Sequence, residues 1–377
     1  MKITKIRVSI LETPGANRIF DLTMLAGMRR PRWIHGSSTA SDGYSQVMHV
    51  ETDEGITGIC TVGEGVAGRL DRDTLDQIRA VAVGEDPLAR EMLYQKLHTG
   101  TRWVYRQPGW GGTLDNCLWD IAGKAANLPV HALIGRVRDS IPMYMNIRGE
   151  TKEEAAEDAI RAVEAGFPAV KDHFYHPVEE NIQWFRAIRD AVGPDIDIMH
   201  DPVGIYSFEQ AVRVGRELED LAYRWIEEPL PERQHNKLKQ LCDALDIPVL
   251  APEMMMNDVD LSAQWLISGA TDMIRGNARH GATSVLKLAH LAELHGTTVE
   301  LNAGGGLFGL VHGHILSCIF NTSYYEFFGG DNEQAGKEIG MLNPLTPTGA
   351  RMYPPDGPGW GAEWDWAYFN GKVVEEW

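Results

Sequence analysis

The chain has 377 residues, of which 44% are hydrophobic and 23% charged, and its formal net charge is −18. This length exceeds what one hydrophobic core usually supports, so we expect two domains, and no apolar run approaches the roughly 18 residues of a membrane span. The acidic balance disfavours a nucleic-acid surface, and four widely spaced cysteines indicate neither a zinc site nor a disulfide framework. We therefore expect a cytoplasmic protein with neither a membrane nor a nucleic acid as partner.

The N-terminal part of the chain has the pattern of an α+β domain. Residues 3–8 and 45–52 alternate between apolar and polar side chains, as strands do, and a helical period extends from residue 70 to about 127. Between the two strands, residues 20–42 show little periodicity and are rich in aromatic and basic side chains. We expect a long loop here that covers a substrate, with Arg29 as a candidate to bind a distal carboxylate.

From residue 141 onward, short apolar segments alternate with amphipathic segments of helical period. The apolar segments are residues 141–145, 169–171, 196–200, 224–227, 249–251, 273–275, 298–301 and 324–328. Seven or eight such β-then-α units predict an α/β fold, a parallel barrel with helices outside. A doubly wound open sheet is the competing fold, but no GxGxxG follows the first strand.

Three carboxylates, Asp201, Glu227 and Glu253, each come directly after one of these predicted strands. They are separated by equal intervals of 26 residues, one β-then-α unit each. A barrel places such side chains together at the face where active sites lie, and their like charges repel unless a cation neutralises them. Oxygen ligands favour Mg²⁺. The alternative is that the three acids simply cap the helices that follow.

Several ordered motifs resemble the enolase superfamily, in its mandelate racemase/muconate lactonizing enzyme branch. They are Val-Lys-Asp-His at 170–173, Asp201, Trp-Ile-Glu-Glu-Pro at 225–229, Ala-Pro-Glu at 251–253, and the framing segments 114–124 and 355–361. The resemblance implies a modified (β/α)₇β TIM-type barrel with an N-terminal α+β capping domain. We expect the capping domain with its lid loop at residues 1–130, the barrel at 131–348, and a segment that returns to the capping domain at 349–377.

By this resemblance, Asp201, Glu227 and Glu253 hold Mg²⁺, and the reaction begins with removal of a proton α to a carboxylate. Lys171 and His173 are two residues apart on a strand and therefore share a face. Relatives usually have Lys-x-Lys at this place, whereas this chain has Lys-Asp-His. We expect His173 to be the base and Lys171 to bind the substrate carboxylate, although the sequence leaves open which of the two is the base.

The opposite face departs from the racemase pattern. Racemases of the family place an Asp and a His at the ends of strands six and seven, but here Asn302 stands at the His position. An amide cannot shuttle protons, so racemisation lacks a proton donor on that face. Syn elimination of water needs only one acid/base, because the protonated His173 can return its proton to the departing hydroxyl.

We therefore predict a lyase, a Mg²⁺-dependent dehydratase that converts an aldonate or aldarate to its 2-keto-3-deoxy acid through an enediolate. A racemase, epimerase or cycloisomerase on the same scaffold is the nearest alternative, and a metal hydrolase or a barrel without catalysis are others. Glu326, after the last strand, is a further catalytic candidate near the substrate carboxylate. The remaining substrate-binding candidates are Asn302, Arg275, His314 and Arg29. We also expect a homo-oligomer.

Overall fold

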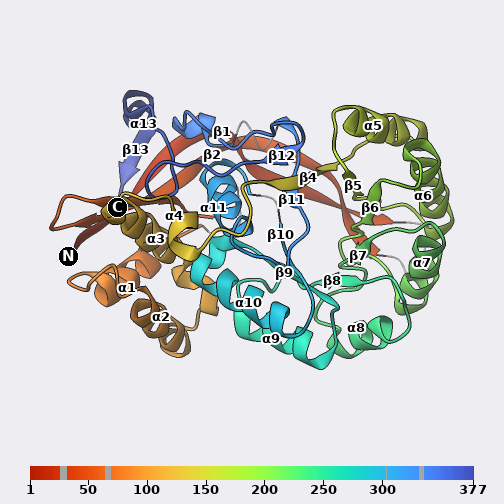
Figure 1. Ribbon diagram of the computed structural model, residues 1–377, viewed down its shortest axis with the longest axis horizontal. Coiled ribbons are helices and arrows are strands. Elements are labelled where there is room, and N and C mark those ends of the chain that lie inside the picture. Colours follow the sequence, from red (N-terminus) through yellow and green to blue (C-terminus); the bar gives the residue numbers. More distant parts are fainter. Residues whose placement is uncertain (26–31, 64–68, 303, 331–334) are drawn as a thin grey trace.

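The computed structural model describes residues 1–25, 32–63, 69–302, 304–330 and 335–377 (Figure 1). Its N-terminal part is built on a four-stranded sheet of order β13-β1-β2-β3, in which every pair is antiparallel. These strands are β1 (Ile3–Leu25), β2 (Arg32–Thr52), β3 (Thr57–Thr61) and β13 (Val373–Glu376). Because β13 pairs with β1, the C-terminal segment returns to the capping domain.

Helices accompany this sheet. Those within residues 70–127 fall where the helical period predicts them, whereas the short helices at 130–134 and 366–372 were not predicted. The helices are α1 (Arg72–Ala82), α2 (Arg90–Val104), the 3₁₀ turn η1 (Pro108–Gly111), α3 (Gly112–Ala126) and α4 (Val130–Ile134), with α13 (Trp366–Lys372) near the C-terminus. The side chain of Asp71 caps α1 by accepting from Thr74 N, and α3 ends at Asn127 in the left-handed conformation.

The prediction of a long loop at residues 20–42 is wrong. In its described part the chain forms a hairpin, since β1 and β2 stay paired from Ile3 opposite Thr52 to Leu25 opposite Arg32. In Figure 1 this hairpin extends from the capping domain across the view as far as the barrel strands. In the outer part of the hairpin Leu22 is 66% exposed, and without a buried face this part does not require alternating apolar residues, so its sequence has no period of two. Arg29 lies outside the described residues.

The second domain is a nearly closed barrel of eight parallel strands in the order β10-β9-β8-β7-β6-β5-β4-β11, with the short β12 (Arg351–Met352) antiparallel to β4. The strands are β4 (Ile141–Asn146), β5 (Ala169–Asp172), β6 (Asp197–His200), β7 (Trp225–Glu227), β8 (Val249–Ala251), β9 (Met273–Gly276), β10 (Val299–Leu301) and β11 (Tyr325–Phe327). All eight predicted strands are confirmed. Such a sheet has a packed interior, here filled by Tyr144, Met199, Trp225 and their neighbours.

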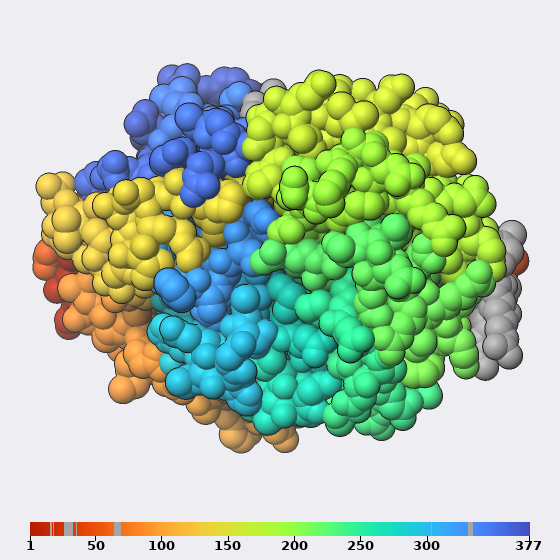
Figure 2. Space-filling model, turned by 45° about the vertical axis from the view of Figure 1, so that its right-hand side comes forward, coloured from red at the N-terminus to blue at the C-terminus, as the bar shows by residue number. Residues whose placement is uncertain are grey.

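One helix follows each of the first seven barrel strands. These helices are α5 (Lys152–Glu164), α6 (Val178–Val192), α7 (Phe208–Asp220), α8 (His235–Cys242), α9 (Val259–Ser268), α10 (Ala282–Leu294) and α11 (Gly306–Leu316). Figure 2 shows successive units as bands around the outside of the barrel, in sequence order. Within the described ranges, no helix combines the length and the apolarity needed to cross a membrane.

The framing motifs join the two domains. On α3, Asn116 Nδ2 donates to Ala278 O at 2.7 Å and Asn116 Oδ1 accepts from Ala282 N at 2.9 Å, so this amide binds the segment between β9 and α10. Asp120 Oδ1 accepts from Trp360 N at 3.0 Å, which attaches the C-terminal segment to the same helix. These contacts fix the capping domain beside the carboxyl ends of the strands.

Candidate active site

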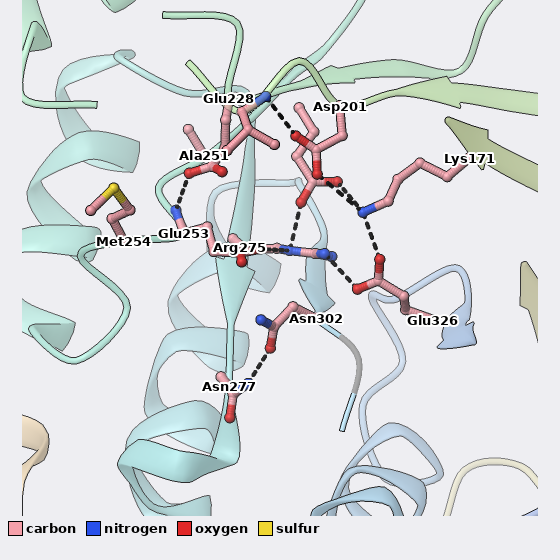
Figure 3. A network of polar contacts seen from close by, with 12 residues as sticks. Lys171, Asp201, Glu228, Ala251, Glu253, Met254, Arg275, Asn277, Asn302 and Glu326 are labelled. Atoms are coloured by element: carbon pink, nitrogen blue, oxygen red, sulfur yellow. Dashed lines mark hydrogen bonds and ion pairs between the residues drawn. The ribbon is translucent and has the colours of Figure 1, made fainter. Parts of the chain in front are cut away.

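Charged side chains from five neighbouring strands, β5 to β9, and from β11 meet at the carboxyl end of the barrel (Figure 3). We call them the strand-end cluster: Lys171, Asp201, Glu227, Glu253, Arg275 and Glu326. All except Glu253 are buried. The convergence follows from the parallel sheet, in which every strand points its carboxyl end to the same face.

Lys171 is enclosed by carboxylates. Its Nζ lies 2.6 Å from Glu326 Oε1, 2.9 Å from Glu227 Oε2 and 3.5 Å from Asp201 Oδ2. Burial by itself lowers the pKa of Lys171, but the carboxylates of Glu227 and Glu326 outweigh it and raise this pKa well above its usual value. Lys171 is therefore held as a cation and is poorly suited to accept a proton.

Arg275, expected from the sequence to bind substrate, instead contacts the protein's own carboxylates. Its Nε lies 2.9 Å from Glu227 Oε1 and 3.2 Å from Glu253 Oε2, and its Nη2 lies 2.7 Å from Glu326 Oε2. Its Nη1 is buried with no hydrogen-bond partner among the described residues. Only that nitrogen remains to donate to a substrate oxygen.

The cluster fits a divalent cation in charge and in donor type. Its four carboxylates and two cations leave a net charge of −2, which one Mg²⁺ would balance, and oxygen ligands are those that Mg²⁺ prefers. Burial raises the pKa of Glu227 to about 7 in spite of Arg275 and Lys171. In the part of the chain that the structure describes, no three His, Cys, Asp or Glu side chains already surround a point as metal ligands do.

His173 stands at the edge of this cluster and is partly exposed. Its Nε2 lies 3.1 Å from Asp201 Oδ2, and its side chain is 25% exposed, whereas that of Lys171 is 1% exposed. Burial lowers the pKa of His173, but the Asp201 carboxylate outweighs it and raises this pKa above the usual value. Of the two candidate bases, His173 is thus the accessible one.

Two amides occupy the strand ends opposite β5. Asn277 follows β9, which is four strands from β5 in the sheet, and its Nδ2 donates to Asn302 Oδ1. Asn277 Oδ1 in turn accepts from Arg279 N at 2.6 Å. Neither amide gains or loses a proton at ordinary pH, so these two strand ends provide no acid or base.

The structure does not bring His314 to the cluster, so its prediction as a substrate-binding residue is wrong. His314 lies on α11, fully buried, where its Nδ1 accepts from His131 N at 3.2 Å and its Nε2 lies 3.1 Å from Trp360 O. Burial lowers its pKa to about 3. The reason is that α11 is buried on every side, so a polar position on it can face α4 and the C-terminal segment instead of the cleft.

Sequence reasoning missed several residues around the cluster. Asn146, at the end of β4, donates from Nδ2 to Glu326 Oε1 at 3.3 Å. Its position at the carboxyl end of a predicted strand could have marked it in the sequence. Glu232 accepts from Glu253 N and from Met254 N, the latter at 3.0 Å, and fixes the backbone of a metal-ligand candidate. Glu232 lies in a loop beyond β7, where nothing in the sequence marks it.

A cavity of about 570 Å³ adjoins the cluster at Glu253 and separates the capping domain from the barrel. Residues of both domains line it, among them Arg69, Arg106 and Trp110 from the capping side and Arg279 from the barrel side. Its volume lies within the range of small-molecule sites. The strand-end cluster and this cavity together form the candidate active site.

Comparison with known proteins agrees with this geometry. Residues 24–135 match the profile of the mandelate racemase/muconate lactonizing enzyme N-terminal domain, and residues 154–368 match the enolase C-terminal domain-like profile. An L-talarate/galactarate dehydratase of Salmonella typhimurium is 27% identical over 78% of this chain and 74% of its own length. A D-galactarolactone cycloisomerase of Agrobacterium fabrum is 28% identical over 81% of this chain and 79% of its own.

Among solved structures, the D-glucarate dehydratase of Agrobacterium tumefaciens in complex with magnesium superposes with a TM-score of 0.83. The two chains are 28% identical, and the superposition covers 100% of each. The similarity thus extends over both domains and includes a relative with bound magnesium.

Proposed function

Because the chain belongs to the enolase superfamily, in its mandelate racemase/muconate lactonizing enzyme branch, we propose that it is a Mg²⁺-dependent dehydratase of sugar acids. The substrate would be an aldonate or aldarate and the product the 2-keto-3-deoxy acid. One observation carries the choice of reaction: a titratable and partly exposed side chain, His173, stands beside Asp201 at the end of β5, whereas a pair of amides stands at the opposite strand ends. Sugar-acid dehydratases among the relatives support it.

Asp201, Glu227 and Glu253 would hold the Mg²⁺. A bound Mg²⁺ would act as a Lewis acid, stabilising the negative charge that develops on the substrate carboxylate when the α-proton leaves. Lys171 and Arg275 would add fixed positive charge at the same place, with Arg275 Nη1 free to donate to a substrate oxygen.

The proton transfers need only one protein group. His173 Nε2 takes the proton from the α-carbon, and its imidazolium then gives that proton to the β-hydroxyl, which leaves as water. The carbon–hydrogen and carbon–oxygen bonds break on the same face, and the resulting enol tautomerises to the 2-keto acid. Asp201, 3.1 Å from His173 Nε2, would stabilise the imidazolium between the two transfers.

A racemase or epimerase would need a second acid/base on the opposite face. The Asn277–Asn302 amide pair cannot act as one, and His280, on the cavity wall, has its pKa lowered to about 3 by burial and by Arg279. A histidine that is neutral at physiological pH is a poor proton donor. These observations favour elimination over inversion.

The test is a panel of aldonates and aldarates assayed with Mg²⁺ for keto-acid formation, with solvent-deuterium exchange measured in parallel. A dehydratase forms keto acid, and His173→Asn abolishes it, whereas the matched control His176→Asn retains it. His176 is near in sequence but contacts Trp184 and Glu180 instead of the cluster. Deuterium exchange into substrate without keto acid would instead establish the racemase, and the proposal would be wrong.

A further inference from the structure

The cavity beside the strand-end cluster is lined by more positively charged than negatively charged side chains. Three arginines line it, Arg69, Arg106 and Arg279, and we call them the guanidinium wall. Among the described residues that line the cavity, Glu253 is the only carboxylate, and it pairs with Arg275 of the cluster. The guanidinium wall therefore faces the cavity with no carboxylate of the lining paired to it.

The partners of the three arginines lie outside the cavity lining or are lacking. Arg106 Nη2 lies 2.8 Å from Asp71 Oδ2, and Arg69 Nη2 donates to the amide oxygen of Asn17 at 2.7 Å. Arg279 forms no ion pair among the described residues, and its Nε is buried with no hydrogen-bond partner. The charge of Arg279 at the cavity wall is therefore not balanced by a carboxylate of the described chain.

Arg279 is also held rigidly by both domains. It lies on the 3₁₀ turn η2 (Ala278–His280), whose first residue is bound by Asn116 of the capping domain. Its own N–H donates to Asn277 Oδ1, the amide next to the cluster. At Gly112 a Cβ atom would come within 2.4 Å of Arg279 O, so the capping helix and this turn pack backbone against backbone. Such support suits an oriented ligand contact.

We propose that the substrate is a dicarboxylate, whose reacting carboxylate lies at the strand-end cluster and whose second carboxylate binds the guanidinium wall, with Arg279 as its principal donor. This inference rests on the proposed function and decides between its two substrate classes in favour of the aldarate. Guanidinium groups bind carboxylates through paired N–H donors, and the neutral hydroxymethyl end of an aldonate would leave the wall unmatched. Glu253 and the three arginines line the same cavity, so a single bound molecule can contact both groups.

The decisive experiment compares kcat/KM for a six-carbon aldarate and the aldonate of the same configuration. We expect the aldarate to be preferred by at least about 10-fold, and Arg279→Met to lower kcat/KM for the aldarate about 10- to 100-fold while changing the aldonate value little. Arg69→Met should act in the same direction, and the exposed Arg213→Met on α7 is the matched control. Equal use of both substrates, or an equal loss on both, overturns the inference but leaves the dehydratase intact.

A binding measurement separates the inference from the proposed function. In calorimetry with Mg²⁺, adipate should bind the parent at least about 10-fold more tightly than hexanoate, and Arg279→Met should abolish that preference. Adipate undergoes no dehydration, so this result stands even if no sugar acid yields a keto acid, an outcome that would refute the dehydratase alone. Equal affinities of the parent for adipate and hexanoate would refute the dicarboxylate site.

Discussion

In the strand-end cluster each cation contacts at least two carboxylates, whereas the guanidinium wall has one ion pair for its three arginines. The first region is buried, and its surplus negative charge suits a metal ion. The second borders an open cavity, and its surplus positive charge suits an anionic ligand. The difference indicates that the barrel supplies the charges for the reaction, while the junction with the capping domain supplies those that select the substrate.

The largest effect should come from removing the central cation of the cluster. Lys171→Met keeps the length of the side chain but leaves three buried carboxylates without their common partner, so we expect a loss of about 3–5 kcal/mol in the free energy of unfolding. Activity should fall about 10²- to 10³-fold, as when one donor to a developing charge is removed.

Thermal unfolding and keto-acid assays of this variant check both numbers. The exposed pair of Lys239 and Asp243 provides the control, because Lys239→Met should change stability by less than about 1 kcal/mol. If Lys171→Met is as stable as that control, the cluster is not the tightly coupled network described above.

A smaller effect should follow when the two regions are loosened from each other. Asn116→Leu leaves Ala278 O and Ala282 N without their partners, at a cost of about 1–3 kcal/mol for each buried group. Since Ala278 begins the turn that carries Arg279, KM should rise more than kcat falls. An unchanged KM with a lowered kcat would show that this contact acts on the cluster and not on the guanidinium wall.

The effect that is smallest at neutral pH concerns His312, whose contribution to stability changes only as the pH falls. Burial, with Arg279 and Arg275, lowers the pKa of His312 to about 3, and its neutral Nε2 accepts from Ala278 N at 3.0 Å. The unfolded chain binds the proton near the usual pKa of about 6.5, so the stabilisation is complete above that pH and declines by up to about 1.4 kcal/mol per pH unit toward pH 3.

Urea unfolding of the parent and of His312→Gln at pH 7, 6 and 5 tests this sign. The parent should lose stability relative to the variant as the pH falls, because glutamine keeps an acceptor but binds no proton. Parallel curves would show that His312 is not held neutral by the fold.

The sequence predicts the barrel and the cluster far better than the guanidinium wall, for a physical reason. Buried parallel strands require apolar segments, and the chain has all eight; Asp201, Glu227 and Glu253 follow three of them at regular intervals. Arg69 and Arg106 lie outside the barrel strands and meet Arg279 only through domain packing, which no local pattern encodes. The exposed outer part of the β1–β2 hairpin, within residues 20–42, was missed for the same kind of reason, since no buried face constrains its residues.

The account depends most on Mg²⁺ binding by the three strand-end carboxylates, which calorimetric titration of the ion measures directly. We predict that Asp201→Asn, Glu227→Gln and Glu253→Gln each weaken Mg²⁺ binding at least about 10-fold, since each removes one anionic ligand. Glu300→Gln, which alters a buried carboxylate on β10 that accepts from Ser323 N instead of joining the cluster, should leave the affinity unchanged. Parent-like Mg²⁺ affinity in Glu227→Gln would contradict the assignment of this site.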